Sequence, residues 1–154
     1  MPSLRSFFRG DKAESHTAIE ALAPYGVAEP TRQALASYLQ AAEDRALYRF
    51  NPAYLAEQLN STRRQALELL AAALQAGIVN LNWEVQCPGC GYRAHAFDGL
   101  REAHSDFVCD MCTMAFPAHL DDEIHITFTI SQRIRTLKDV GAATDDDWRG
   151  AIDA

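Results

Sequence analysis

A chain of 154 residues, of which 48% are hydrophobic, is long enough to bury the core of one ordinary domain or of two small ones. Its first ten residues lack the apolar run of a signal peptide and no later stretch has the length of a membrane span, so we expect a cytoplasmic protein without a membrane-spanning segment. The net charge of −7 is unevenly distributed: residues 87–130 contain two arginines against seven acidic residues, which disfavours a phosphate backbone as the ligand of that part.

The first segment, residues 1–30, is expected to form an N-terminal arm and a short helix. Asp11 and Glu14 have the spacing of a capping box, and Pro24 would end the helix. From residue 31 onward the pattern is clearer, because apolar residues recur at steps of three and four residues over about five helical turns. The residues of this stripe are Leu35, Tyr38, Leu39, Ala42, Ala46 and Phe50.

Two further helices are predicted before the first strand. Asn51 is expected to cap one of them, with Pro52 in its first turn, where the missing N–H costs nothing. After a polar break, residues 62–76 form the next helix, which Gly77 ends in the left-handed conformation. We assign residues 31–86 to one helical, winged-helix-like region.

The helix over residues 62–76 has two leucines whose roles differ. Leu67 continues an apolar stripe with Leu70 and Leu74, so we assign it to the core. Leu69 lies off that stripe. We therefore expect Leu69 to be an exposed side chain that a partner could cover.

Strand-like patterns follow the helices. Residues 79–86 alternate between apolar and polar side chains, which predicts a half-buried strand with Glu84 on its polar side. Other segments are assigned as strands over 92–97, 113–116 and 124–130, a short helical pattern over 98–104, and a C-terminal extension over 131–154 that we expect to be partly disordered.

All four cysteines occur in two Cys-x-x-Cys pairs that are separated by 18 residues. Each pair places two thiolates at the tip of a tight turn, and two such turns supply the four soft ligands of a closed tetrahedral zinc site. Gly91, directly after the first pair, tolerates positive φ and lets backbone N–H groups point at the sulfurs. Four thiolates leave no position for a catalytic water, so we predict a zinc ribbon over residues 87–130 with one structural Zn²⁺. Its ligands are Cys87, Cys90, Cys109 and Cys112.

Iron, a redox pair and disulfides are the alternative interpretations of these cysteines, and we rank them below zinc. A thioredoxin-like redox pair needs a single Cys-x-x-Cys at the head of a helix in a βαβ unit, whereas these pairs lie between strand-like runs. Two structural disulfides would require an oxidising compartment, and the sequence contains no signal for one.

The segment from Leu55 to Val79 resembles a bacterial winged helix-turn-helix, because a short helix, a polar turn, a longer helix ending in Gly and an outgoing strand follow in that order. In that family the longer helix lies in the DNA major groove, and side chains near its start contact bases and phosphates. The resemblance implies such a role for Arg63, Arg64 and Gln65. Leu67, Glu68 and Leu69 stand where polar or basic groups are usual, and they favour a protein partner instead.

A larger block, residues 51–135, carries a second set of motifs. These are Asn51-Pro52, Leu55-Ala56, Ala76 to Val79, Trp83 to Val85, the two cysteine pairs, Phe128 and an arginine at 133 or 135. The block resembles an uncharacterised bacterial winged-helix and zinc-ribbon domain found upstream of the catalytic domain in some adenylate or guanylate cyclases. The resemblance implies a regulatory or adaptor module with four zinc-ligand cysteines and no established activity.

These patterns together predict an α+β fold, in which N-terminal helices and a winged helix-turn-helix precede a four-cysteine zinc ribbon of short antiparallel strands. The sequence contains no zinc-deaminase triplet, nucleophile elbow or nucleotide-binding loop, and we expect no enzyme. Our first hypothesis is a non-catalytic adaptor or sensor module of bacterial signalling that binds a protein partner. The alternative is a DNA-binding transcriptional regulator. The candidate contact residues are Arg63, Arg64, Gln65, Glu68 and Leu69.

Overall fold

The structure is a computed structural model, and it describes residues 16–97, 106–117, 123–138 and 140. The predicted arm with its Asp11 and Glu14 capping box, the helical pattern over residues 98–104 and the tail beyond residue 140 lie outside these residues. The chain divides into two compact units, which are described separately. The helical unit comprises the residues up to Asn80 together with Phe128–Val140, and the cysteine unit is built on Leu81–Thr127.

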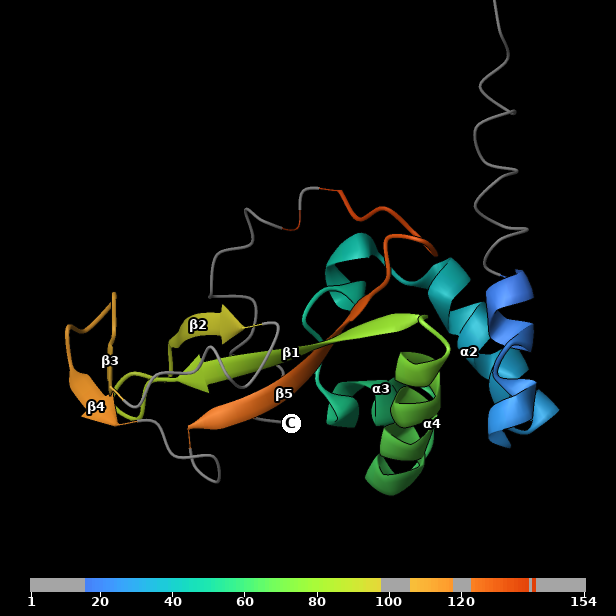
Figure 1. The fold of residues 1–154 in the computed structure, drawn as a ribbon, viewed down its shortest axis with the longest axis horizontal. Helices are drawn as coiled ribbons and strands as arrows, with labels where there is room; N and C mark the ends of the chain where they lie inside the picture. Colours follow the sequence, from blue (N-terminus) through green and yellow to red (C-terminus); the bar gives the residue numbers. More distant parts are fainter. Residues whose placement is uncertain (1–15, 98–105, 118–122, 139, 141–154) are drawn as a thin grey trace, which may run out of the picture. The chain divides into compact units, whose positions relative to one another are not determined.

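The described part of the chain has an α+β fold, as predicted, with helices and small antiparallel sheets (Figure 1). No helix in this part is long and apolar enough to cross a membrane. After the helical residues 16–20 the elements are η1 (Ala23–Tyr25), α2 (Glu29–Ala41), η2 (Asp44–Leu47), α3 (Pro52–Gln58), α4 (Arg63–Gln75), β1 (Val79–Gln86), β2 (Arg93–Phe97), β3 (Asp106–Val108), β4 (Ala115–Pro117) and β5 (Ile124–Ile130).

The predicted five-turn helix over residues 31–50 is wrong in its second half, because α2 ends at an extended Ala42 (φ −68°, ψ 141°). The side chain of Arg135 binds the end of this helix: its Nη1 donates hydrogen bonds to the carbonyl oxygens of Leu39 (3.1 Å) and Ala42 (3.0 Å). Arg135 also forms an ion pair with Asp44, in the turn that follows. These contacts satisfy carbonyl groups that a helix end leaves without partners, so the helix stops although its apolar pattern continues.

The predicted cap of α3 is confirmed, and α4 begins at a cap that the sequence analysis did not name. Asn51 Oδ1 accepts a hydrogen bond from the N–H of Tyr54 at 2.7 Å, and Thr62 forms a capping box with Gln65. Gly77 follows α4 with φ +74°, the left-handed conformation expected of it. Local side-chain chemistry therefore fixes the ends of both helices.

The expected faces of α4 are reversed for two leucines. Leu69 is only 4% exposed and belongs to the core, whereas Leu67 is 37% exposed. The buried face of α4 consists of Ala66, Leu69, Leu70, Ala72 and Ala73. Alanines form much of this face, because small side chains allow neighbouring elements to approach closely. A stripe traced through the leucines alone therefore points to a different side of the helix from the buried face.

The cysteine unit contains most of the sheet structure. A three-stranded sheet has the order β2-β1-β5, and β1 and β2 pair antiparallel with Trp83 opposite Phe97. The backbone N–H of Gln86, at the end of β1, donates to the carbonyl oxygen of Glu123, just before β5, at 2.7 Å. Strands β3 and β4 form a separate antiparallel hairpin in which Phe107 lies opposite Phe116 (Figure 1).

The helical unit has an apolar core and one short backbone bridge. Phe50 and Phe128 exchange two backbone hydrogen bonds of 2.9 and 2.8 Å, and their rings lie 6.2 Å apart. The bridge connects the segment before α3 to β5. Buried residues of this unit include Leu22, Leu35, Leu39, Leu47, Leu55, Leu69, Leu70, Ile78, Ile130 and Ile134.

Candidate metal centre

The four cysteine sulfurs gather in one cluster, as the spacing of the two pairs predicts. All four lie within 4.8 Å of one another. Cys87 Sγ is 3.6 Å from Cys112 Sγ, and Cys90 Sγ is 3.6 Å from Cys109 Sγ. No disulfide links them. Four thiolates around a tetrahedral ion with metal–sulfur bonds of about 2.3 Å would lie about 3.8 Å apart, so the cluster has the donor set and the size to hold a metal ion.

The two loops that carry these cysteines have equivalent backbone hydrogen bonds. In each loop the N–H of the first cysteine donates to the carbonyl oxygen five residues later, and the carbonyl oxygen of that cysteine accepts from the N–H four residues later. The four bonds are Cys87 N–H to Tyr92 O (2.8 Å), Gly91 N–H to Cys87 O (2.9 Å), Cys109 N–H to Met114 O (2.9 Å) and Thr113 N–H to Cys109 O (2.8 Å). Each loop is therefore a knuckle that presents two sulfurs on the same side.

One position in each knuckle has positive φ. Gly91 has φ +75°, which confirms the expectation for this glycine, and Thr113 occupies the equivalent position with φ +60°. A β-branched residue is an unusual choice for this conformation. The Thr113 hydroxyl donates a hydrogen bond to the carbonyl oxygen of Cys112 at 2.7 Å, which helps to hold the turn.

The four sulfurs influence one another's protonation. Burial opposes ionisation of Cys87, but the backbone N–H groups of Cys90 and Gly89 and the nearby sulfurs outweigh it and lower the pKa of this thiol to about 7. At Cys90 the N–H of Tyr92 favours the thiolate, yet partial loss of hydration and the three neighbouring cysteines raise the pKa to about 12. Four negative sulfurs this close together repel one another, so a bound cation is required to deprotonate all of them.

A small apolar cluster supports the knuckles. It comprises Val85, Cys87, Phe107, Cys109 and Phe116, with Tyr92 and Ile124 packed against it. The first cysteine of each pair is buried in this cluster, and the second cysteine of each pair is exposed. The Phe107 and Phe116 rings lie 6.1 Å apart across the β3–β4 hairpin. The knuckles are thus attached to the core by one sulfur each.

Sequence analysis missed a buried polar group in the same unit. Glu84, placed on the polar face of its strand, is 1% exposed. It forms an ion pair with Arg93 at 2.6 Å and accepts a hydrogen bond from the Thr127 hydroxyl at 3.0 Å. The three residues lie on β1, β2 and β5, so the carboxylate links all three strands of the sheet. An acidic residue within an alternating strand gives no local sign of this role, although an arginine nine residues later is compatible with it.

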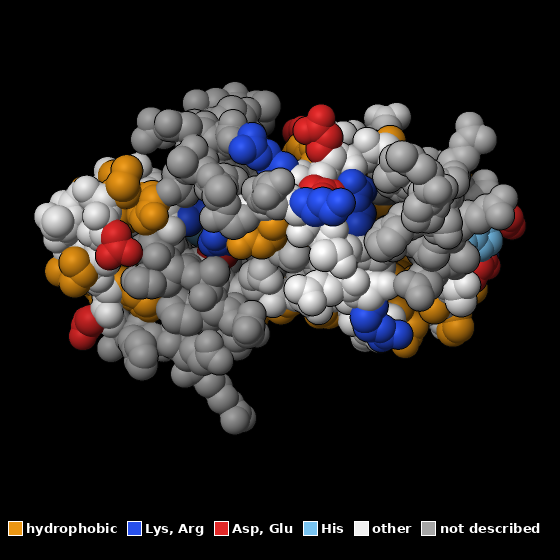
Figure 2. Space-filling model, turned by 90° about the horizontal axis from the view of Figure 1, so that it is seen from above, with side chains coloured by type: hydrophobic (Ala, Val, Ile, Leu, Met, Phe, Trp, Pro, Cys, Tyr) orange, Lys and Arg blue, Asp and Glu red, His pale blue; other side chains and the backbone are white. Residues whose placement is uncertain are grey.

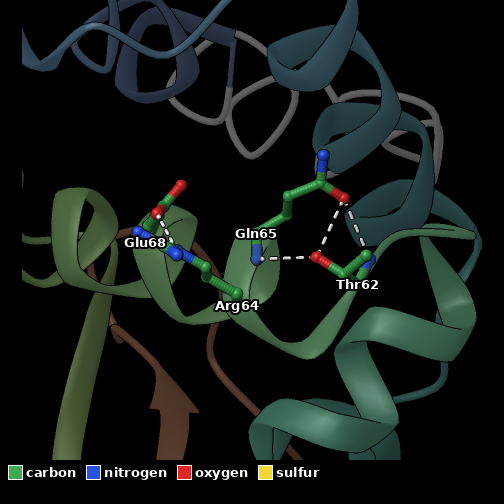
Figure 3. A network of polar contacts seen from close by, with 4 residues as sticks. All are labelled: Thr62, Arg64, Gln65 and Glu68. Carbon is green, nitrogen blue, oxygen red and sulfur yellow. Dashed lines mark hydrogen bonds and ion pairs between the residues drawn. The ribbon is translucent and has the colours of Figure 1, made fainter.

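The predicted contact residues on α4 lie around its first two turns (Figure 3). Gln65 Oε1 accepts from the N–H of Thr62 at 2.9 Å, and Arg64 Nε donates to Glu68 Oε1 at 3.1 Å. The Arg64 and Glu68 pair is exposed, and such pairs contribute little to stability. Two of the predicted contact side chains therefore bind each other, and a third is part of the capping box. Arg63 is exposed, and Leu69 is buried.

The structure thus defines an α+β protein with a centre of four cysteines that is suited to hold a metal ion. The chain belongs to a protein family of unknown function, DUF5939, whose model matches residues 14–147. Neither the curated proteins nor the solved structures contain a significant match to the chain.

Proposed function

We propose that the protein is a non-catalytic zinc-binding adaptor or sensor module that binds a protein partner. The observation that carries this proposal is the gathering of four sulfurs within 4.8 Å of one another. Four thiolates favour zinc, which we rank above iron, and they fill its tetrahedral coordination without leaving a position for a reacting water. We therefore assign the ion a structural role, with Cys87, Cys90, Cys109 and Cys112 as its ligands.

The order of elements along the chain supports a winged-helix assignment. The elements follow in the order that a winged helix has: α2, the bridging residue Phe50, α3, α4, β1 and β5. Strands β1 and β5 take the place of the wing strands. In the sequence, the two knuckles and the strands β2, β3 and β4 lie between these two strands. The resemblance to modules upstream of cyclase catalytic domains is consistent with this arrangement and favours a regulatory role.

The outer face of α4 is the partner surface of this proposal. Leu67, Ala71 and Leu74 are exposed and are spaced by four and three residues, so they share one side of the helix. Exposed Arg63 lies at the start of the same helix. An apolar stripe beside a basic residue is typical of a surface that a protein partner covers. Leu67 and Leu74 take the role that we had expected for Leu69.

The metal assignment is tested by elemental analysis of reduced protein purified without added metal. We expect one zinc per chain, and Cys87→Ser should lower the zinc content well below one. A Thr113→Ser variant, which leaves all four thiols in place, is the matched control. Absence of metal from the reduced protein would contradict the assignment.

The partner assignment is tested by affinity capture from the native cytosol. Leu67→Asp should abolish capture of a specific protein while leaving the thermal unfolding curve nearly unchanged, because the side chain is already exposed. Replacing Arg63 and Arg64 together with alanine should have a smaller effect. If the two arginines alone control capture, the apolar stripe is not the contact surface.

A DNA-binding regulator is the second candidate, favoured by exposed Arg63 near the N-terminus of a helix in the recognition position. Few cations are available on this helix, so we expect binding to a duplex to be weak and to be lost by about 200 mM salt. A nanomolar, sequence-specific shift of DNA mobility at that salt concentration would reverse the ranking of the two candidates.

A further inference from the structure

The two arginines that follow β5 have different surroundings. The side chain of Arg135 binds two carbonyl groups at the end of α2 and the carboxylate of Asp44. Arg133 is exposed, and within the part of the chain that the structure describes its guanidinium has no hydrogen bond or ion pair. Figure 2 shows Lys and Arg side chains in the middle of the view that lie next to Asp and Glu side chains. Arg133 therefore has N–H donors that are available to a ligand.

The side chain of Arg133 lines a hollow of about 630 Å³ in the helical unit. Three segments that are distant in the sequence form its walls: the helical residues from Thr17 to Ala21, the end of α4 at Ala76 and Gly77, and residues 133 and 134. Sites for small molecules in proteins have volumes of about 300–1,000 Å³. The hollow thus has the size of a site for a small ligand.

Backbone contacts determine where Arg133 lies. The N–H of Ser131 donates to the carbonyl oxygen of Ile78 at 2.8 Å, and the N–H of Ile134 donates to the carbonyl oxygen of Ser131 at 2.9 Å. These bonds attach the segment after β5 to the residue that follows Gly77. A Cβ built on Gly77 would lie 3.3 Å from Arg133 Nη1, so the guanidinium lies close to the backbone at the end of α4. The charged group is therefore held at the wall of the hollow.

The other side chains of the walls are small and mostly apolar. They include the methyl groups of Ala18, Ala21 and Ala76, and Arg133 has the only charge among the described residues that line the hollow. A guanidinium donates two parallel hydrogen bonds to one carboxylate. The hollow also borders the C-terminal end of α4, where the helix dipole disfavours a second negative charge. The chemistry of the walls therefore favours a ligand with one carboxylate and an apolar body.

We propose that this hollow binds a small organic acid that has a single carboxylate on a compact apolar body. The carboxylate accepts hydrogen bonds from the guanidinium of Arg133, and the apolar body contacts the methyl groups of Ala18, Ala21 and Ala76. A bound acid would connect the N-terminal helical residues, the end of α4 and the segment after β5. This inference rests on the proposed role as a sensor, and it names the chemical class of the ligand that is sensed.

Hexanoate is the probe for this site, and hexanamide and acetate are the matched compounds. The zinc-loaded full chain, labelled with ¹⁵N, is titrated with each compound at constant ionic strength. The Nε–H signal of Arg133, assigned from its loss in Arg133→Lys, should shift saturably with hexanoate. Hexanamide lacks the charge and acetate lacks the apolar body, so each should bind about tenfold more weakly or worse.

Variants separate the contributions of the guanidinium and of the apolar walls, with the ¹³C methyl signal of Ala76 as the measurement. Arg133→Gln should weaken hexanoate binding by about tenfold or more, and Arg133→Lys, which retains the charge but not the planar fork, should weaken it less. Ala21→Leu places a larger side chain in the hollow and should also weaken binding. Ala71→Leu makes the same change at an exposed position of α4 outside the hollow, and it should leave binding unchanged.

Three outcomes would overturn the assignment of this site. The first is that hexanoate causes no saturable shift of the Arg133 signal, and the second is that hexanamide binds as tightly as hexanoate. The third is that Arg133→Gln lowers the temperature of unfolding but leaves hexanoate binding unchanged, because Arg133 would then act only as a cation at the end of α4. None of these results affects capture of a protein partner through Leu67, so this inference can fail while the proposed partner surface stands.

Discussion

The two units of this protein bury different kinds of side chain. The helical unit has a core of leucines, isoleucines and alanines, and its helices α3 and α4 begin at side-chain caps. The cysteine unit has a cluster of five buried side chains in the described residues, and two of those five are the cysteines Cys87 and Cys109. The helical unit thus has the apolar material to fold by itself, whereas in the cysteine unit the candidate ligands are also part of the core. A bound ion would replace apolar area as the main source of stability there.

Metal removal should produce the largest effect, and it should show that the folding of the cysteine unit depends on the metal while that of the helical unit does not. Structural zinc in small finger domains contributes about 10–16 kcal/mol, so chelation should unfold the cysteine unit, while the helical unit retains its circular dichroism. Fluorescence of Trp83, measured in a Trp148→Phe background, reports on the cysteine unit. Loss of helical signal together with the Trp83 change would show that the helical unit also depends on the metal. Restoring zinc should restore the original spectrum.

Acidification should weaken metal binding steeply. The raised pKa of Cys90, about 12, and the raised pKa of Cys112 mean that both thiols hold protons at neutral pH, and a metal must displace them. Each displaced proton makes the apparent affinity rise about tenfold for every pH unit, so the protons of Cys90 and Cys112 alone give a rise of at least about 100-fold per unit, and Cys87 steepens it below its pKa of about 7. Competition with a chromogenic chelator between pH 6 and 8 measures this slope. A pH-independent affinity would mean that the thiols are already ionised without a metal.

Breaking the buried ion pair should destabilise only the cysteine unit. Glu84→Gln removes a charge from a 1% exposed position and leaves Arg93 without its carboxylate partner, which typically costs about 3–5 kcal/mol. Urea unfolding followed through Trp83 should show this loss. The double variant Glu84→Met with Arg93→Met removes both charges, and it should be less destabilised than Glu84→Gln.

The leucines of α4 provide a matched pair in the helical unit. Leu69→Ala should cost about 2–5 kcal/mol because it removes buried methyl groups, whereas Leu67→Ala should cost less than about 1 kcal/mol. Both substitutions remove the same atoms from the same helix, so helix propensity cancels in the comparison. Equal losses measured by urea unfolding at 222 nm would contradict the assigned faces of α4.

Sequence reasoning succeeded where neighbours in the chain determine the structure. The cap at Asn51, the left-handed Gly77 and Gly91 and the tight turns of the two Cys-x-x-Cys pairs depend on residues a few positions apart. The sequence shows these signals directly, since a short side chain before a helix or a glycine after it has few other roles.

The errors concern contacts that join distant parts of the chain. The end of α2 depends on Arg135, which binds carbonyl groups of Leu39 and Ala42, and no local feature predicts that contact. Burial of Glu84 likewise depends on Thr127, 43 residues later. The position of Leu69 depends on which elements cover the alanines of α4. In each case a tertiary contact overrides a correct local pattern.

The smallest changes in stability are expected from substitutions that compare the two knuckles with each other. Gly91 and Thr113 occupy equivalent positions with positive φ, and a Cβ built on Gly91 meets no atom closer than 3.7 Å. The cost of Gly91→Ala is therefore conformational alone, about 1–2 kcal/mol for a residue forced into the left-handed region. Thr113→Gly relieves that same strain, but it loses the hydroxyl bond to Cys112 and increases the freedom of the unfolded chain, so we expect a net change below about 1 kcal/mol.

Thr113→Ala separates the contribution of the hydroxyl bond from that of the backbone strain, because it removes the hydroxyl and retains the strained backbone. It should be the least stable of the variants at position 113, below both Thr113→Gly and the natural threonine. Thermal unfolding of the zinc-loaded proteins, followed through Trp83, measures this ranking, and zinc content measured in parallel shows that all four thiols still bind the ion. If Thr113→Ala were more stable than Thr113→Gly, the second knuckle would not carry backbone strain in solution, and its equivalence to the first knuckle would fail.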